Sequence, residues 1–192
     1  MKKLLLLLLC VPMIVFGQNW NQLGNDIDGE AANDESGRSV SLSSDGNIMA
    51  IGASKNDGNG ADAGHVRVYE NVGGTWSQIG QDIDGEAVGD LSGHSVALSS
   101  DGTIVAFGEK GYDGKGRVRV FKYNGSSWSL LGGATDMVGD SGDEAGTSVT
   151  ISYDGTIVAI GAPEYNIGGR VRVYKYNGRS EEHTSELQSQ WD

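Results

Sequence analysis

The 192-residue chain carries 14 Lys and Arg against 26 Asp and Glu, which gives a net charge of −12 at pH 7. An acidic chain of this kind is repelled by the phosphates of nucleic acids and of anionic membranes, so the composition argues against a binder of either. Glycine supplies 31 residues and proline two, and the hydrophobic 38% is grouped in short Val, Ile and Leu runs that exclude a disordered chain.

Residues 1–17 have the pattern of a secretory signal peptide. Two lysines precede an apolar run over residues 4–16, and the small residue Gly17 suits cleavage directly after it. The run is too short to span a bilayer, so we expect no transmembrane segment in the mature chain. The alternative, lipidation of Cys10, lacks the usual local motif. The sequence therefore predicts export, with the protein secreted or held at the cell surface.

The C-terminal residues 179–192 resemble nothing that precedes them. They begin with RSEEHTSELQS, whose back-translation resembles a widely used sequencing-library adaptor. The alternative is a genuine polar tail. We favour a non-native tail, exclude these residues from the fold, and expect the natural protein to continue beyond residue 178.

Between the two ends, residues 18–178 contain three copies of one unit. Three short patterns recur in the same order: Trp-x-x-Leu/Ile-Gly, Gly-x-Ser-Val and Asp-Gly. The Asp-Gly pairs begin at Asp45, Asp101 and Asp154, so the period is 56 residues and then 53. Self-similarity at such a period is the signature of a repeat architecture.

Each unit contains four short strand candidates. An Asp-Gly pair between two apolar runs predicts a tight hairpin, and the segment beginning at Val66 alternates with period two. Four antiparallel strands in each repeat are typical of a β-propeller blade. A β-solenoid coil is usually shorter, and a sandwich would not repeat so regularly. We predict an all-β fold, a partial β-propeller of about three four-stranded antiparallel blades, at about 37–83, 93–133 and 146–178, with a stray outer strand at 20–27.

The repeated patterns resemble the FG-GAP repeat of integrin-α-like propellers. The resemblance covers residues 20–178 and includes Gly161-Ala162-Pro163, which matches the second half of the family's name. The chain departs from the family at Ser36, Ser92 and Ala145, where a Phe is expected. It also lacks the acidic run of the family's calcium loop at Ser44-Asp45-Gly46.

The resemblance implies a topology and an origin. It places the Gly-x-Ser-Val strand innermost in each blade and the Trp strand outermost, and it lets segment 20–27 complete the last blade of a closed ring. Together with the leader and the acidic repeats, the chain is similar to surface and secreted proteins of the Bacteroidetes group.

The segments that cross from one blade to the next are the best candidates for a site. They carry four acidic residues at positions 1, 3, 5 and 9, a spacing that suits the oxygen ligands of calcium. The eight candidates are Asp26, Asp28, Glu30, Asp34, Asp82, Asp84, Glu86 and Asp90.

A solvated acidic turn, whose Asp side chains bond their own backbone, is the alternative to a calcium loop. Gly29 and Gly85 stand at position 4 of these loops, whereas a regular calcium loop has its glycine at position 6. The third copy has Ala134 and Val138 at two of the four places. Both observations favour the acidic turn, and calcium is the only cofactor that the sequence suggests.

Catalysis finds little support. His94 and Ser95 are neighbours on a predicted strand, so their side chains point to opposite faces. No Gly-x-Ser-x-Gly motif is present, and the single cysteine falls in the expected leader. The once-per-repeat tryptophans could stack on sugars, but packing between blades explains their recurrence more simply.

These observations lead to one functional hypothesis and two alternatives. We expect an exported, non-enzymatic binding or adhesion module that recognises an extracellular protein or a glycan through loops on one propeller face, an expectation that rests on the family resemblance. The alternatives are the propeller portion of a secreted polysaccharide-active enzyme and a structural repeat protein of a surface layer.

Overall fold

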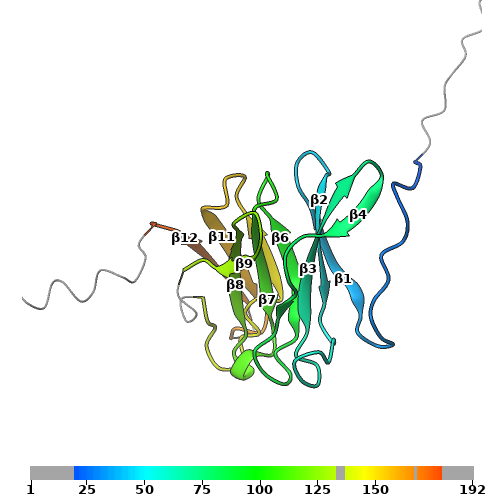
Figure 1. Ribbon diagram of the computed structural model, residues 1–192. Helices are drawn as coiled ribbons and strands as arrows, with labels where there is room; N and C mark the ends of the chain where they lie inside the picture. The colour runs from blue at the N-terminus through cyan, green and yellow to red at the C-terminus, as the bar shows by residue number, and fades with distance from the viewer. Residues whose placement is uncertain (1–19, 133–136, 167, 179–192) are drawn as a thin grey trace, which may run out of the picture.

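The computed structural model describes residues 20–132, 137–166 and 168–178, so the expected leader and tail lie outside the described residues. The described chain folds into three antiparallel sheets that stand side by side (Figure 1). A short 3-10 turn, η1 (Tyr112–Gly114), is its one helical element. No helix within these ranges is both long enough and apolar enough to cross a membrane.

Each sheet is a meander in which consecutive strands pair. The first contains β1 (Ser36–Leu42), β2 (Ile48–Ala53), β3 (His65–Val72) and β4 (Thr75–Gln78), and the short β5 (Ile83–Asp84) also pairs with β3. The second contains β6 (Ser92–Leu98), β7 (Ile104–Glu109), β8 (Arg117–Tyr123) and β9 (Trp128–Leu130). The third contains β10 (Ser148–Ile151), β11 (Ile157–Ala162) and β12 (Arg170–Lys175). The predicted all-β, partial β-propeller is therefore confirmed, with three strands rather than four described in the third blade.

The Asp-Gly pairs form the hairpins between the first two strands of each blade, as predicted. The glycines Gly46, Gly102 and Gly155 have φ angles of 73°, 70° and 73°, which a residue with a Cβ adopts at a cost. In the first blade the Asp45 carboxylate accepts hydrogen bonds from the Ser43 hydroxyl at 2.6 Å and from the backbone N–H of Asn47 at 3.0 Å. The side chain of Asp45 thus fixes the turn that the glycine permits.

These hydrogen bonds make the turns sensitive to acid. The Ser43 hydroxyl and then the backbone N–H of Asn47 lower the pKa of Asp45 to about 2, and Ser152 and Thr156 do the same to Asp154. A carboxyl whose pKa is lowered by folding contributes stability above its unfolded pKa of about 4, and this contribution disappears as the pH falls toward about 2.

We expect an Asp45→Asn, Asp154→Asn double variant to be less stable than the parent protein at pH 5 and to approach it at pH 2. Urea unfolding at pH 5, 3 and 2 measures this difference. Glu70→Gln, at an exposed position of β3, is the control and should keep the parent's stability at each pH. A stability difference that stays constant from pH 5 to pH 2 would contradict the assignment.

The hydrophobic core lies between blades, because each sheet buries a face against the next. One cluster joins the first and second blades and includes Val66, Val68, Val105 and Phe107, all 0% exposed. A second cluster joins the second and third blades around Val118, Val120, Val158 and Ile160. Contacts between β1 and β6 and between β6 and β10 place the Gly-x-Ser-Val strands next to one another along the stack.

A repeated polar contact, which we term the blade joint, links the innermost strands. The Ser39 hydroxyl donates to the carbonyl of Gly93 in the following blade at 2.8 Å, and Ser95 donates to Gly146 in the same way at 2.8 Å. The partner strand has a glycine at each joint: a Cβ on Gly52 would stand 2.0 Å from the Gly93 oxygen. The recurring serine and glycine of each repeat are therefore explained by close approach of the next blade's backbone.

The expected outer strand at 20–27 is not formed within the described residues, and its pairing in a closed ring stays a prediction. A strand needs a partner, and the third strand of a preceding blade is absent from the described residues. The segment is nevertheless held against the outer strand of the first blade, because the indole N–H of Trp76 donates to the Leu23 carbonyl at 2.9 Å. In the second blade Trp128 donates in the same way to Ile79, at the end of the preceding blade's outer strand, also at 2.9 Å. Residues 23 and 24 therefore occupy the position that the end of a preceding outer strand would have.

Candidate functional site

The crossover segments and the long loops between the second and third strands meet at one end of the blades, the lower end in Figure 1. We term this end the loop face; it comprises residues 26–35, 54–64, 79–91, 110–116, 137–145, 163–166 and 168–169. Backbone hydrogen bonds join its loops, for example from the N–H of Lys55 to the carbonyl of Asp34 at 3.2 Å and from Gly111 to Asp90 at 3.1 Å. The loop face is therefore built on the ends of the sheets.

One acidic residue of each crossover segment pairs with arginine on the third strand of the blade that follows. In the second blade the Glu86 carboxylate lies 2.9 Å from Arg117 and 3.3 Å from Arg119. In the first blade Glu30 pairs with Arg67. The sequence marked both glutamates as calcium candidates, whereas the structure gives each of them a guanidinium partner.

A second acidic residue holds the turn of each crossover segment. Asp34, Asp90 and Asp143 are buried, with 5%, 3% and 3% of their surface exposed. Their carboxylates accept backbone N–H groups of the same turn, from Ala31 at 3.1 Å, from Ala87 at 2.9 Å and from Asp140 at 2.9 Å. Each aspartate thus bonds the backbone of its own turn, as the acidic-turn alternative expects, but from a buried rather than a solvated position.

The third repeat keeps this design, although the sequence interpretation had it broken. Asp140 lies 2.7 Å from Arg170 and 2.9 Å from Arg172, which is the role that Glu86 has in the second repeat. Gly139 donates to Gly116 as Gly85 donates to Gly64, at 2.9 and 2.8 Å, and this match fixes the alignment. Gly139 lies 11 residues after Trp128, whereas Gly85 lies 9 residues after Trp76, and one residue is missing between Asp140 and Asp143, so a count from the tryptophan misplaced both acidic positions. Ala134 lies outside the described residues.

Three groups with metal-ligating atoms come together across the first blade. Within the described residues, ligand atoms of Glu30, His65 and Asp82 all lie within 4.8 Å of one another. His65 is buried, which lowers its pKa and favours the neutral imidazole that binds metals. Sequence reasoning missed this residue, because nothing in the spacing of His65 relates it to either acidic loop.

Arg67 occupies the centre of this group. Its guanidinium donates to the Asp82 carboxylate in a two-pronged contact, at 2.9 and 2.6 Å, and also pairs with Glu30. Hydrogen bonds from Arg67 lower the pKa of both carboxyls. A cation would have to displace this arginine, whose single positive charge already offsets part of the charge of the two carboxylates.

The remaining sequence candidates, Asp26, Asp28 and Asp84, are exposed on the loop face. Asp26 accepts a hydrogen bond from the side-chain amide of Gln22 at 2.8 Å. Burial of its carboxyl, and then the neighbouring Asp82, raise the pKa of Asp84. The structure thus gives the eight candidates different roles. Glu30 and Glu86 pair with arginines, as does Asp82, and Asp34 and Asp90 hold turns. The remaining three face solvent.

We expect calcium to leave the melting temperature of the chain unchanged, because Arg67 already pairs with both Glu30 and Asp82 and the buried aspartates accept backbone N–H groups. Thermal unfolding with and without calcium chloride, together with calorimetric titration, measures this. Arg67→Gln is the matched variant: it releases both carboxylates and should gain a response to calcium. A saturable heat of binding with a raised melting temperature in the parent protein would instead support the calcium-loop hypothesis.

The recurring serine beside His94 has a structural role that explains its recurrence. The Ser95 hydroxyl donates to the carbonyl of Gly146 across the blade joint. Trp128 is 3% exposed and belongs to the core between the first two blades, which agrees with the expected packing role of the tryptophans. Trp20, in contrast, is fully exposed.

Comparison with solved structures finds similar arrangements at low sequence identity. TolB from Acinetobacter baumannii matches with 13% identity and a TM-score of 0.46 over 74% of this chain and 30% of that one. Kuenenia stuttgartiensis hydrazine synthase matches with 15% identity and a TM-score of 0.43 over 71% of this chain and 44% of that one. The chain therefore spans less than half of either protein.

A search of curated protein sequences found no match. A family model does match part of the chain. The matched region, residues 27–69, runs from the first crossover segment through β1 and β2 into β3, which is the unit that the structure repeats. The model that it matches is the FG-GAP repeat, so the first of the three blades is similar to that repeat family.

Proposed function

We propose that this chain is the propeller-repeat portion of an exported, non-enzymatic binding or adhesion protein, and that it contacts an extracellular protein or glycan through the loop face. The observation that carries the proposal is the contrast between fixed and free acidic groups. An arginine-paired carboxylate and a buried aspartate hold each crossover segment, while Asp26, Asp28 and Asp84 stay exposed on the first two. Loops held by a rigid scaffold are where binding residues concentrate.

Charge sets the class of partner. The chain has a net charge of −12, and exposed carboxylates that include Asp26, Asp28 and Asp84 lie on the loop face, so a partner with basic or neutral polar groups fits it and a polyanion does not. The experiment therefore compares probes of different charge. The proposal also includes export, which the pattern of residues 1–17 supports, and a lack of enzymatic activity.

The test immobilises the chain and measures binding of chitosan as a cationic glycan, dextran as a neutral one and alginate as an anionic one, together with a lysine-rich peptide. We expect saturable binding of a cationic or neutral probe and none of alginate. The triple variant Asp26→Asn, Asp28→Asn, Asp84→Asn should lose this binding while keeping its melting temperature. Glu70→Gln, an exposed charge outside the loop face, is the control and should bind as the parent does.

Two results would overturn the proposal. Binding that persists in the triple variant would remove the loop face as the contact surface. Release of new reducing ends or new peptide N-termini during the measurement would show turnover, and would favour the polysaccharide-active or another enzymatic alternative.

A further inference from the structure

The third strand of each blade begins with two alternate residues that lie beside the acidic crossover segments. The second and third blades have arginine at both positions, whereas the first blade has His65 followed by Arg67. Strand pairing fixes the equivalence, because the first of these residues lies opposite the last residue of the second strand in every blade. The opposed pairs are His65 with Ala53, Arg117 with Glu109, and Arg170 with Ala162. The first blade thus has an imidazole where the other two have a guanidinium.

This exchange changes the balance of charge beside the strand. In the second and third blades, two guanidinium groups pair with two carboxylates. The carboxylates are those of Glu86 and Glu109 in the second blade, and of Asp140 and Asp143 in the third. In the first blade the single guanidinium of Arg67 pairs with two carboxylates, those of Glu30 and Asp82. Arginine is permanently charged and histidine is not, so the first blade lacks one positive charge that the other two have.

The comparison involves only charges of the blade itself. Each of these arginines and carboxylates belongs to the strands of its own blade or to a crossover segment next to it. The Glu30 side chain is 49% exposed, and that of Glu86, which lies between the first two blades, is 54% exposed. Solvent and ions therefore reach this position whether or not another blade precedes it.

The His65 imidazole is buried without a hydrogen-bond partner. Its residue is 4% exposed, and within the described ranges its ring makes no hydrogen bond. A ring nitrogen lies within 4.8 Å of carboxylate oxygens of Glu30 and Asp82, and those two oxygens lie within the same distance of each other. A buried polar group that makes no hydrogen bond costs free energy, and a bound ligand would remove that cost.

We propose that Glu30, His65 and Asp82 bind a transition-metal ion of the zinc class at the loop-face end of β3. Imidazole nitrogen and carboxylate oxygen together are ligands that zinc accepts, and three protein ligands leave a fourth position for water. Zinc lies about 2.0–2.2 Å from each ligand atom, so atoms within 4.8 Å of one another need only small side-chain rotations to share one ion. The ion supplies the positive charge that a second guanidinium supplies in the other blades.

Arg67 decides which ions can bind. It pairs with Glu30 and makes a two-pronged contact with Asp82, so an ion must at least separate it from Glu30. Calcium prefers oxygen ligands and would gain only the carboxylates that Arg67 already holds. A zinc-class ion gains the His65 imidazole as well. Arg67 can keep its contact with Asp82 because each carboxylate oxygen has two lone pairs.

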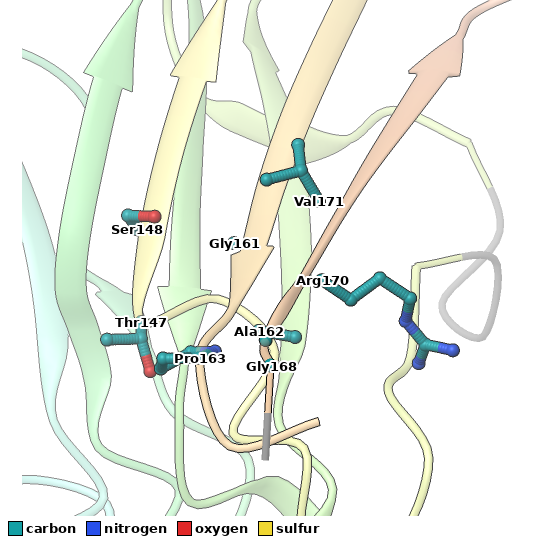
Figure 2. A pocket seen from close by; sticks show the side chains of 9 residues that line it. Thr147, Ser148, Gly161, Ala162, Pro163, Gly168, Arg170 and Val171 are labelled. Carbon is teal, nitrogen blue, oxygen red and sulfur yellow. The ribbon is translucent and has the colours of Figure 1, made fainter. Parts of the chain in front are cut away.

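The third blade shows how an arginine fills the position of His65. Figure 2, which looks into a pocket of that blade, shows the Arg170 side chain extending from the start of β12 away from Ser148. Arg170 lies 2.7 Å from Asp140, and the residue opposite it is an alanine, as it is for His65. An arginine in place of His65 would therefore have the same small cross-strand neighbour and an acidic partner in Glu30.

Calorimetric titration with zinc chloride tests the site, in untagged protein from which metal has been removed by a chelator. The background is Cys10→Ser, His183→Gln, which removes the thiol and the imidazole outside the described residues. We expect saturable binding of one zinc ion per chain, a raised melting temperature, and no heat of binding with calcium chloride.

His65→Arg is the matched variant. Its affinity for zinc should fall by more than about tenfold, since loss of even an outer-shell partner costs about 10–100-fold. Without metal its melting temperature should equal or exceed the parent's, because the variant restores the pairing of the other two blades. Glu30→Gln, at an exposed position, is a second variant that should also weaken zinc binding. His94→Gln removes an imidazole outside the site and should bind zinc as the parent does.

Three results would overturn the proposal. A parent protein that shows no saturable zinc binding would mean that Arg67 keeps both carboxylates. Zinc binding that persists unchanged in His65→Arg and Glu30→Gln would place the ligands elsewhere. An equal loss of affinity in His94→Gln and in His65→Arg would show general binding to histidine and not a site at β3.

Discussion

The Glu109→Ala variant is expected to lose about 3–5 kcal/mol of its free energy of unfolding. Glu109 is 0% exposed, and its carboxylate accepts hydrogen bonds from both Arg117 and Arg119, which are 1% and 5% exposed. Removing one partner of a buried ion pair leaves charge without compensation in a medium of low polarity. Glu86 remains near both arginines, but it is largely exposed and cannot replace the buried contact. Urea unfolding of the parent and the variant measures the loss.

The first blade provides the matched control for this change. The cross-strand pair that is Glu109 and Arg117 in the second blade is Ala53 and His65 in the first. The double variant Glu109→Ala, Arg117→His copies that pair, in which burial lowers the pKa of the imidazole and so favours its neutral form. We expect it to recover much of the stability that the single variant loses. A double variant as unstable as the single one would show that lost packing, rather than uncompensated charge, sets the cost.

The Gly108→Ala variant is expected to lose about 1–3 kcal/mol or more, from one added methyl group. Its Cβ would stand 1.9 Å from the Gly146 oxygen and 2.7 Å from the Gly146 carbonyl carbon, both backbone atoms of the next blade. The next blade is fixed by its own sheet, so the methyl group can be accommodated only if the two blades separate. That separation exposes core residues such as Phe107, which is 0% exposed.

Gly161→Ala, at the same position of the third blade, is the control. Its Cβ would meet the Ser148 hydroxyl at 2.2 Å, a side-chain atom that can rotate away, and no backbone of a following blade. Urea unfolding measures both changes. We expect little loss for Gly161→Ala. Equal losses at the two positions would mean that the cost arises within a strand and not at the joint.

The crossover segments illustrate how far sequence patterns reach. The spacing of Asp26, Asp28, Glu30 and Asp34 correctly marked a segment where acidic residues recur, but it did not separate their roles. Glu30 pairs with Arg67, which is far along the chain, and Asp34 closes a local turn. The pairing depends on which face of β3 carries Arg67 and on how the segment crosses that face. In the third repeat, two extra residues before the loop and one missing residue within it hid the same design from a count of positions.

The sequence by itself determined the local structure of this protein. Asp-Gly pairs between apolar runs specify hairpins because glycine tolerates the positive φ of the turn, and the three-fold recurrence of those hairpins specifies blades. These properties depend on residues close together in the chain, so they can be predicted from the amino-acid sequence. The all-β fold and the partial propeller followed from them, and the once-per-repeat recurrence of tryptophan predicted the packing role of Trp128.

Only the tertiary structure decided the contacts between blades. That Gly52 and Gly108 must lack a Cβ, that Glu109 holds two arginines, and that the segment at 20–27 is not a strand all depend on what an adjacent blade supplies or fails to supply. Residues equivalent in sequence, such as Val66 and Val171, differ in exposure from 0% to 70%. The physical reason is that burial and hydrogen-bond satisfaction belong to pairs of surfaces, and a repeat carries only one surface of each pair.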